Sequence, residues 1–479
     1  MLLSELSEGG APVDIKALAY DSRDVAPGTL FFCVPGARSD GHDHAAQAVA
    51  RGAVALVVER PLALGVAELR VPSVREAMAP LAARFYGEPS KALRVIGITG
   101  TNGKTTTAFL VRQILESAGE PCALLGTVKS VIGGVEGEVI RTTPEAIDLQ
   151  ASLAAMRDAG DRACAIEVSS HALALHRADA IDFAGAVFTN LTQDHLDFHP
   201  DMEAYFQAKR VLFDSNPGVA VLNADDGYGR RLLDEFAGTT SYAIERAADY
   251  RASELRSGIA GAAFTVRTPD GEARVTTRLP GFFNASNALA AIAITHRLGV
   301  PLERIAAALA MADPAPGRFQ ALDEGQPFAV IVDYAHTPDS LENVLRAARS
   351  LTAGRVISLF GCGGDRDRGK RPQMGRISAE LADHTVVTSD NPRSEEPQAI
   401  VGEILAGTAG AAPGHAVEAV VDRRDAIARA LSLAEPGDVV VIAGKGHEQG
   451  QEFADGRKVE FDDVSVAREL LRPSEVRGA

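Results

Sequence analysis

The sequence contains no tryptophan, and aromatic residues make up only 5% of its 479 residues. A hydrophobic core must therefore be built mainly from alanine and valine. With 46% hydrophobic and 23% charged residues, the composition is that of an ordinary globular protein. At this length we expect about three domains of roughly 150 residues each.

Cysteine is also scarce, and the four cysteines, Cys33, Cys122, Cys164 and Cys362, form no CxxC pair. No zinc-ligand spacing is present, and isolated cysteines in a long chain are typical of a reducing compartment. No apolar run approaches the ~20 residues of a membrane-spanning helix. Residues 1–16 lack the basic and then apolar pattern of a signal peptide. We therefore predict a cytoplasmic protein that does not insert into membranes.

Basic residues are outnumbered by acidic ones, 48 to 64, which gives a formal net charge of −16. This balance argues against nucleic-acid binding, because neutralising phosphates requires a basic surface. An anionic substrate would need local clusters of Arg and Lys to offset the overall field. Cations beside glycine-rich turns are therefore the most informative features.

Two segments that contain Gly and Pro, and therefore disfavour helices, divide the chain. They are Tyr86–Ser90 and Asp313–Gly317. We predict three domains, over residues 1–89, 90–316 and 317–479, with a hinge at Pro314–Gly317.

Short β-branched runs alternate with alanine-rich stretches through the later two blocks. This alternation predicts an α/β fold with mainly parallel sheets covered on both faces. Residues 250–279 are the exception and predict antiparallel strands around the turn Pro269-Asp270-Gly271. The predicted parallel strands are Arg94–Thr99, Ala163–Val168, Gly185–Thr189, Gly218–Leu222, Ala329–Val332, Arg355–Phe360, His384–Thr388 and Asp438–Ala443.

Nearly every predicted strand is followed directly by polar or glycine-rich residues. Ligands of open parallel sheets bind beyond the carboxyl ends of the strands. Two such sheets predict one active site in a cleft between them. The segments are GTNGKT, EVSSH, TNLTQDH, NADD, DYAHTPD, GCGGDRDRGKR, SDNPR and GKGHE.

The segment from Ile96 to Thr106 follows a strand and opens a helix, which predicts a phosphate-binding loop. Backbone N–H groups of Gly100, Thr101, Asn102, Gly103 and Thr106 can surround phosphate oxygens. Lys104 can reach the β- and γ-phosphates of ATP, and the Thr105 hydroxyl can hold Mg²⁺. The alternative interpretation is a glycine-rich turn without a ligand.

The motifs, taken in order, resemble the Mur ligase family over nearly the whole chain. The resemblance implies an N-terminal UDP-binding domain, a central P-loop-type ATPase domain and a C-terminal Rossmann-like domain. It rests on DSRDVAPGTLFFCVPG, TGTNGKTTT, TTPEA, EVSSHAL, FTNLTQDHLDFH, LNADD, GFFNASNALAA, PGRFQ, VDYAHTPD, GCGGDRDRGKRP, DNPR and GKGHE.

The resemblance assigns metal and ATP contacts in the central block. Glu167 and His195 become ligands of Mg²⁺, although spacing alone equally allows caps and loop contacts. Lys209 becomes an N6-carboxylysine that binds a second Mg²⁺, whereas a lysine on a helix is more often a solvated surface residue. Asn284 contacts ATP in this interpretation, and its alternative role is helix capping.

Two further residues near the second linker complete the ATP contacts that the resemblance implies. Arg318 resembles the arginine that reaches the γ-phosphate, and Asp333 resembles the acidic residue that contacts the ribose. His336, in the same turn as Asp333, is a weaker candidate that supports the loop.

The muropeptide contacts implied by the resemblance lie in the first two blocks. Ser22 corresponds to a contact with the uridine nucleotide, and Tyr20 and Ala37–Ser39 flank it. Leu175 stands where some members have a glutamine. Taken alone, each hydroxyl residue is better explained as a turn or cap former. The whole set is Tyr20, Ser22, Thr142, Thr143, Ser169, Leu175 and Arg177.

The last block carries cations and glycines in two segments that follow neighbouring predicted strands. In the family that the chain resembles, a DNPR motif marks enzymes that add diaminopimelate. A fork-shaped guanidinium suits the second carboxylate of this amino acid, and Arg393, assisted by Arg366, can supply it. Glu448 can accept from the ammonium group. The alternative is a salt-bridged surface loop. The predicted amino-acid contacts are Arg366, Asp390, Asn391, Pro392, Arg393, Gly444 and Glu448.

These expectations combine into an ATP-dependent amide ligase of peptidoglycan biosynthesis. It adds meso-diaminopimelate to the side-chain carboxylate of D-Glu in UDP-N-acetylmuramoyl-L-alanyl-D-glutamate, through an acyl phosphate and with Mg²⁺. We predict a monomer, with Lys104, Lys209, His195 and Arg318 as catalytic residues. The alternatives are a ligase that adds L-lysine, a folylpolyglutamate-type ligase and a nucleotide-binding regulatory module.

Overall fold

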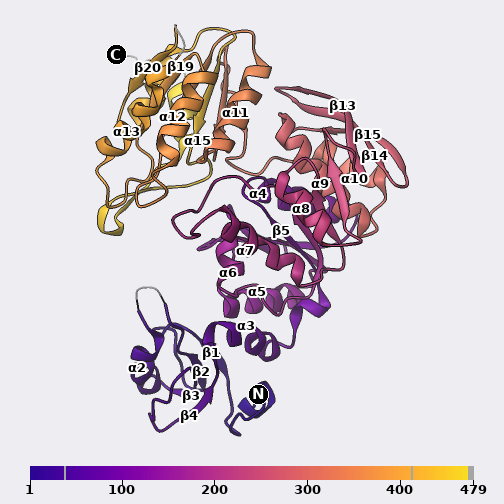
Figure 1. Cartoon of the computed structure of the whole chain (residues 1–479), viewed down its shortest axis with the longest axis vertical. Helices are drawn as coiled ribbons and strands as arrows, with labels where there is room; N and C mark the ends of the chain where they lie inside the picture. Colours follow the sequence, from indigo (N-terminus) through magenta and orange to yellow (C-terminus); the bar gives the residue numbers. More distant parts are fainter. Residues whose placement is uncertain (37–38, 412–413, 473–479) are drawn as a thin grey trace, which may run out of the picture. The chain divides into compact units, whose positions relative to one another are not determined.

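The computed structural model describes residues 1–36, 39–411 and 414–472, and Figure 1 labels its helices and strands. Contacts divide the chain into two compact units. Unit 1 comprises Met1–Thr99, Gly119–Ala186 and Ala208–Val219. Unit 2 comprises Gly100–Ala118, Val187–Gln207 and Ala220–Ala479.

Unit 1 starts with a parallel sheet in the order β1-β2-β3-β4. Successive side chains of a strand point to opposite faces. Leu30 and Phe32 therefore enter one hydrophobic cluster and Phe31 enters another. The elements are α1 (Leu3–Leu6), β1 (Ala17–Ala19), β2 (Thr29–Phe32), η1 (Gly41–His44), α2 (Ala45–Ala50), β3 (Ala53–Val58), β4 (Ala67–Arg70), α3 (Val74–Phe85) and η2 (Pro89–Ala92).

The remainder of unit 1 contains a second sheet in which β5, β9 and β6 are parallel and β7 and β8 continue it antiparallel. In the register of β5 and β9, Ile98 pairs with Glu167. Thr99 and Glu167 therefore lie at the same edge of the sheet. The elements are β5 (Arg94–Thr99), β6 (Cys122–Leu125), β7 (Ser130–Ile132), β8 (Val135–Gly137), α5 (Ala146–Ala159), β9 (Ala163–Glu167) and α6 (Ser170–Ala174).

Two elements, β10 (Phe183–Phe188) and α7 (Met202–Asp214), have residues in both units. In unit 2, β11 and β12 are parallel, and β13, β14 and β15 form the antiparallel set predicted for residues 250–279. The elements are α4 (Lys104–Ser117), β11 (Ala220–Asn223), α8 (Gly227–Glu235), β12 (Thr240–Ala243), β13 (Tyr250–Gly258), β14 (Gly261–Thr268), β15 (Gly271–Thr277), α9 (Phe282–Arg297) and α10 (Leu302–Met311).

The last part of unit 2 is a six-stranded sheet in the order β16-β17-β21-β18-β19-β20, parallel except for β16. The carboxyl ends of β17, β21, β18 and β19 are therefore adjacent. The elements are β16 (Gln320–Leu322), β17 (Ala329–Asp333), α11 (Pro338–Leu351), β18 (Val356–Phe360), α12 (Lys370–Leu381), β19 (His384–Val387), α13 (Pro397–Ala406), η3 (Gly407–Gly410), β20 (Ala416–Ala419), α14 (Arg423–Leu433), β21 (Val439–Ala443), β22 (Gln451–Glu452), η4 (Ala454–Gly456), β23 (Lys458–Val459) and α15 (Asp463–Leu471).

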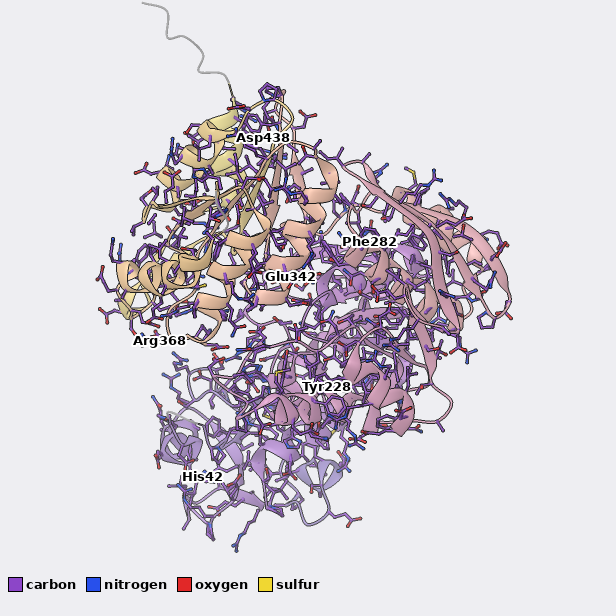
Figure 2. All side chains as sticks on the ribbon, turned by 45° about the horizontal axis from the view of Figure 1, so that its top comes forward. His42, Tyr228, Phe282, Glu342, Arg368 and Asp438 are labelled. Atoms are coloured by element: carbon purple, nitrogen blue, oxygen red, sulfur yellow. The ribbon has the colours of Figure 1, made fainter. Side chains whose placement is uncertain are left out.

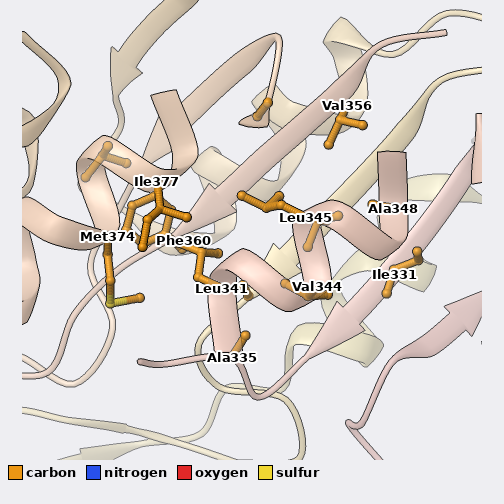
Figure 3. Packing of buried hydrophobic residues seen from close by; sticks show 14 of the residues in the cluster. Ile331, Ala335, Leu341, Val344, Leu345, Ala348, Val356, Phe360, Met374 and Ile377 are labelled. Carbon is orange, nitrogen blue, oxygen red and sulfur yellow. The ribbon is translucent and has the colours of Figure 1, made fainter. Parts of the chain in front are cut away.

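Helix α11 shows how this sheet is covered. Leu341, Val344, Leu345 and Ala348 recur at helical spacing and are all buried. Figure 3 shows this stripe packed beside Phe360 of β18, in a cluster that also includes residues of β17, α12 and α13. A second cluster, with residues of α14 and α15, lies on the other face. Coverage on both faces explains the continuous apolar strands of the sequence.

The predicted α/β fold class is confirmed, and each predicted strand is present within a few residues of its expected bounds. Among the residues that the structure describes, no helix is both long and apolar enough to cross a bilayer.

Candidate active site

The phosphate-loop segment connects β5 to α4 in the conformation that its glycines predict. Gly100 has φ +147° and Gly103 has φ +86°, both in regions that favour glycine. Gly103 is the N-cap of α4, and no side chain caps this helix. The Lys104 ammonium donates to the carbonyls of Gly100 and Thr101 at 2.9 and 2.8 Å. The start of α4 and the Lys104 ammonium therefore suit an anion, whereas the N–H groups of Thr101 and Asn102 already donate to the carbonyl and Oδ1 of Asn190, each at 2.9 Å.

A Cβ at Gly100 would collide with the hydroxyl of Thr189 and lie 3.1 Å from the backbone N and O of Asn190. We therefore expect Gly100→Ala to raise the KM for ATP at least tenfold, because the loop must move to admit the methyl group. The control is Gly119→Ala, which also places alanine at a positive φ, +83°, but meets no atom within 4 Å. Steady-state kinetics on both variants checks this, and an equal KM in the two would contradict it.

The segment after β10 packs against the phosphate loop. Thr189 donates to the carbonyl of Asn102 at 2.6 Å, and the amide N–H of Asn102 donates to Asn190 Oδ1 at 2.9 Å. Thr101 Oγ1 donates to the carbonyl of Thr192 at 3.1 Å. These hydrogen bonds with Thr189, Asn190 and Thr192 hold the phosphate loop in its conformation.

Asp194 is a buried carboxylate that contacts two imidazoles. His195 Nε2 lies 3.4 Å and His336 Nε2 lies 3.8 Å from Asp194 Oδ2. Burial raises the pKa of Asp194, but His195, His336 and the Lys370 ammonium outweigh burial and lower it to about 2. Asp194 therefore remains ionised and orients both rings. His336, the weaker ATP candidate of the sequence, also lines the pocket described next, and its Nδ1 lies 2.9 Å from the Tyr334 carbonyl oxygen.

A pocket of about 190 Å³ collects many of the residues predicted to bind ATP. Predicted residues that line it are Asn102, Gly103, Thr106, Asn284, Arg318 and Asp333. Other lining residues, which the sequence did not single out, include Asn190, Phe283, Tyr334, Ser340 and Asn343.

Arg318 links the pocket to the phosphate loop. Its Nη2 donates to Thr105 Oγ1 at 3.1 Å, and its guanidinium lies 4.3 Å from the ring centroid of Tyr334. Among the described residues, nothing accepts a hydrogen bond from its buried Nε. A guanidinium held flat against a ring, with a donor in reserve, suits an anionic oxygen.

Asp333 and Asn284 make contacts that the sequence did not predict. Both carboxylate oxygens of Asp333 accept backbone N–H groups, from Phe319 at 2.6 Å and from Ala335 at 2.8 Å. Asn284 is not the N-cap of α9, which is Gly281, and its amide donates to the carbonyl of Pro280 at 2.8 Å. Asp333 therefore shapes the turn that faces the pocket as well as lining it.

The GCGGDRDRGKR segment serves two purposes. Arg368, labelled in Figure 2, pairs with Glu403, and the fully buried Arg371 pairs with Glu395 and Glu403 at 2.8 and 2.9 Å. These two arginines form the salt-bridged loop considered as the alternative. Arg366 instead lies 4.0 Å from Asp197, on the segment that carries His195.

Arg393 is held in a left-handed conformation, with φ +50°. Its backbone N–H and its Nε donate to Glu452, each at 3.0 Å, and its Nη1 donates to the carbonyl of Gly364 at 2.8 Å. A Cβ at Gly363 would lie 3.0 Å from Arg393 Nη1 and 3.8 Å from Arg366 Cγ. The two arginines predicted to act together therefore flank the same glycine.

The other predicted amino-acid contacts meet at the ends of β19 and β21. Asn391 Nδ2 donates to Glu448 Oε2 at 2.8 Å. A Cβ at Gly444 would lie 2.8 Å from Asp390 Oδ2, so glycine permits the close approach. Pro392 precedes Arg393 in the same turn, and its carbonyl accepts the N–H of Glu395 at 3.0 Å. The sequence did not single out three residues whose side chains bind this region, Lys445 within the GKGHE segment and Arg423 and Glu452 from other segments.

Unit 1 brings several predicted muropeptide residues together around Thr143. Its hydroxyl donates to the carbonyl of Glu167 at 2.8 Å and accepts the N–H of Ser169 at 3.1 Å. Arg177 donates to the Thr143 carbonyl at 3.3 Å and pairs with Glu145 at 2.8 Å. Thr142 Oγ1 lies 3.1 Å from that of Thr127.

The remaining predicted muropeptide residues make separate contacts and do not gather around Thr143. Tyr20 and Thr142 line one pocket of about 260 Å³. Burial and a 2.7 Å hydrogen bond to Asp148 raise the pKa of Tyr20 to about 12. Ser22 donates to Gln47 at 2.9 Å, and Leu175 is only the C-cap of α6. Ala37 and Arg38 lie outside the described residues.

The residues predicted to hold Mg²⁺ have suitable chemistry. Glu167 is fully buried, and its two oxygens accept the N–H and the hydroxyl of Thr127 at 2.7 and 3.0 Å. Lys209 is only 1% exposed, which contradicts the surface position usual for a helix lysine. Within the described part of the chain, no three His, Cys, Asp or Glu side chains form a metal cluster. One carboxylate with hydroxyl and phosphate oxygens is typical of Mg²⁺ rather than of a closed metal site.

Three family models match consecutive parts of the sequence. The Mur ligase family catalytic domain matches residues 14–86, the Mur ligase middle domain matches 98–295, and the Mur ligase glutamate ligase domain matches 317–446.

Individual relatives match the chain over nearly its whole length. A protein of Syntrophomonas wolfei, named UDP-N-acetylmuramoyl-L-alanyl-D-glutamate–2,6-diaminopimelate ligase, is 48% identical over 98% of this chain and 97% of its own. A protein of Gloeobacter violaceus with the same name is 49% identical over 97% and 96%. A solved structure with this name is 34% identical and has a TM-score of 0.70, covering 98% of both chains.

Proposed function

This chain belongs to the Mur ligase family, and we propose that it is an ATP-dependent ligase that adds meso-diaminopimelate to UDP-N-acetylmuramoyl-L-alanyl-D-glutamate. The observation that carries the proposal is the near-half identity, over almost the full length, to relatives named for this reaction. The DNPR turn, with its buried surroundings and its arginine, supports the choice of amino acid. We place the reaction in the cytoplasm and in peptidoglycan synthesis.

The proposed first step transfers the γ-phosphoryl group of ATP to the side-chain carboxylate of D-Glu, giving an acyl phosphate and ADP. The amide groups of the phosphate loop hold the phosphates, and the Lys104 ammonium offsets the charge of the transferring group. Arg318, near Thr105, contacts the γ-phosphate. Asn284 and Asp333 face the nucleoside.

The proposed second step forms the amide bond. The amine of diaminopimelate attacks the acyl carbon, the bond to the phosphoryl oxygen breaks, and inorganic phosphate leaves. Arg393 and Arg366 bind the distal carboxylate, while Asp390, Asn391 and Glu448 face the distal ammonium. We expect closure about Pro314–Gly317 to exclude water from the acyl phosphate.

Mg²⁺ would be held by Thr105, Glu167, His195 and a carbamylated Lys209. When bound, it would neutralise phosphate charge during transfer. The chain itself would supply a carboxylate, a hydroxyl and an imidazole as ligands. Lys209, buried in α7, supplies the amine that carbamylation would convert into a further carboxylate.

The direct test offers the protein ATP, the UDP-muropeptide and either meso-diaminopimelate or L-lysine, and identifies products by mass spectrometry. We expect the diaminopimelate adduct and ADP, with kcat/KM for diaminopimelate at least 100-fold above that for lysine. A preference for lysine would overturn the amino-acid assignment. Failure to bind the UDP-muropeptide would favour a folylpolyglutamate-type ligase, and absence of any product would favour a regulatory module.

Removing the Arg393 guanidinium is expected to raise the KM for diaminopimelate about tenfold to one-hundredfold, the value of a lost charge-assisted hydrogen bond. The KM for ATP should stay within about twofold. The change is Arg393→Ala, and the control is Arg376→Ala on α12, where an exposed arginine pairs only with Glu380. Equal rises in both KM values would count against this pocket.

A further inference from the structure

Lys445 is a fully buried cation at the end of β21 that no part of the proposed reaction uses. It stands between Gly444, at φ +116°, and Gly446, at φ +54°. A Cβ at Gly446 would lie 2.6 Å from the Gly317 carbonyl oxygen. The chain is therefore closely packed on both sides of Lys445, against the Asp390 side chain at Gly444 and against the Gly317 backbone at Gly446. A buried ammonium is costly unless it is paired and hydrogen-bonded.

The Lys445 ammonium has three oxygen partners. Its Nζ lies 2.9 Å from Asn391 Oδ1, 3.0 Å from Glu448 Oε2 and 3.6 Å from Asp390 Oδ1. The first two contacts are hydrogen bonds, and the third is an ion pair without a hydrogen bond. All three partners are residues assigned above to the amino-acid pocket, and they come from the ends of β19 and β21.

These bonds leave Glu448 in a defined orientation. Its Oε2 accepts from both Lys445 and Asn391, at 3.0 and 2.8 Å. No donor among the described residues reaches its Oε1, and the side chain is 32% exposed. Glu448 Oε2 is thus held by Lys445 and Asn391, and Glu448 Oε1 is available to a ligand.

Lys445 belongs to a cluster of buried charges. Arg423 is also fully buried, and its Nη2 donates to Asp463 at 2.7 Å. Lys445 therefore lies near a second buried cation that also acts on Asp390. Burial alone would raise the pKa of Asp390, but Lys445 and Arg423 lower it, so this carboxyl remains ionised.

We propose that Lys445 is a positioning residue for amino-acid specificity. It fixes Asn391 and Glu448 so that Glu448 presents one oxygen to the distal ammonium of the incoming amino acid. Lys445 itself, having no exposed surface, does not touch the substrate. The inference rests on the proposed function, because the ligand of the pocket is the diaminopimelate proposed above.

The test compares the wild-type protein with Lys445→Met, which keeps the chain length without the charge, and Lys445→Gln, which keeps donors and is more certain to fold. We expect the KM for diaminopimelate to rise about tenfold to one-hundredfold in Lys445→Met and less in Lys445→Gln. The kcat and the KM for ATP should stay within about threefold. Lys458→Met, which changes an exposed lysine of β23, should match the wild type.

A double-mutant cycle with Glu448→Gln separates positioning from general support of the fold. If Lys445 acts through Glu448, Lys445→Met should add less than threefold to the KM of the Glu448→Gln protein. Additive effects, an unchanged KM for diaminopimelate, or an equal rise in the KM for ATP would each overturn the proposal. Failure of the wild type to use diaminopimelate would instead overturn the proposed function.

Discussion

Replacing Lys104 with methionine is expected to lower kcat by about 10²–10³-fold, the usual effect of removing one charged or hydrogen-bonding group that stabilises a transition state. The Lys104 ammonium lies against the carbonyls of Gly100 and Thr101, at the start of a helix without a side-chain cap. In the proposed reaction it offsets charge that builds up as the phosphoryl group moves. Methionine has similar length but no charge.

The kinetic pattern distinguishes this role from simple ATP binding. Loss of an interaction made only in the transition state lowers kcat and kcat/KM together, whereas loss of uniform binding raises KM alone. Lys104→Arg should fall between the methionine variant and the wild type, because it keeps the charge but changes the donor geometry. Lys91→Met is the matched control, since Lys91 is an exposed lysine paired with Glu88. A Lys104→Met protein with kcat within threefold of the wild type would contradict the assignment.

The features that the sequence predicted well are those fixed by neighbours in the chain. The strand Arg94–Thr99, the glycine-rich turn and the helix from Lys104 form one continuous segment, so neighbouring residues are enough to predict the strand, the turn and the helix. The antiparallel strands after Tyr250 follow from the Pro269-Asp270-Gly271 turn in the same way. Continuous apolar runs predicted parallel strands because both faces of the C-terminal sheet are covered.

The features that the sequence did not predict depend on partners distant in the chain. Lys445 binds Asn391, which lies 54 residues earlier, and Asn102 donates to Asp339, 237 residues later. Neither periodicity nor local spacing in the sequence predicts a contact between residues so far apart. Lys209 shows the same limit, since a lysine on an amphipathic helix is normally solvated and this one is buried.

The GCGGDRDRGKR segment shows why composition could not divide the roles of its cations. Arg366, Arg368 and Arg371 are equivalent in the sequence, yet Arg371 is buried against two glutamates while Arg366 is half exposed. The difference arises because Arg371 lies in the first turn of α12, facing α13 and the Glu395 turn. Only the packing of the helices decides which of these arginines is buried in ion pairs and which remains exposed.

Arg423 and Asp463 form a buried ion pair next to the predicted amino-acid pocket, and disrupting this pair is expected to have the largest effect on stability. Both side chains are fully buried, with Nε and Nη2 of Arg423 donating to Asp463 at 2.8 and 2.7 Å. Arg423 also donates to the carbonyls of Ser389 and Ala443, at 3.2 and 3.0 Å. It thereby connects the ends of β19 and β21, from which both pocket turns start.

We expect Arg423→Met to destabilise the protein by about 3–5 kcal/mol, because it leaves the Asp463 carboxylate buried without a partner. For a domain of the length predicted for residues 317–479, the melting temperature should fall on the order of 10 °C. The double variant Arg423→Met with Asp463→Leu should recover part of the loss, since no buried charge remains. It should not recover all of it, because the Ser389 and Ala443 carbonyls still lack their donor.

Arg424→Met supplies the matched control for calorimetry. Arg424 follows Arg423 on α14 and pairs with Glu469 of α15, but both members of this pair are solvent-exposed, so the melting temperature should hardly change. Equal melting temperatures for Arg423→Met and Arg424→Met would contradict a stabilising role of the Arg423–Asp463 ion pair. Because the pocket turns start at Ser389 and Ala443, the surviving folded fraction of Arg423→Met should also show a raised KM for diaminopimelate and an unchanged KM for ATP.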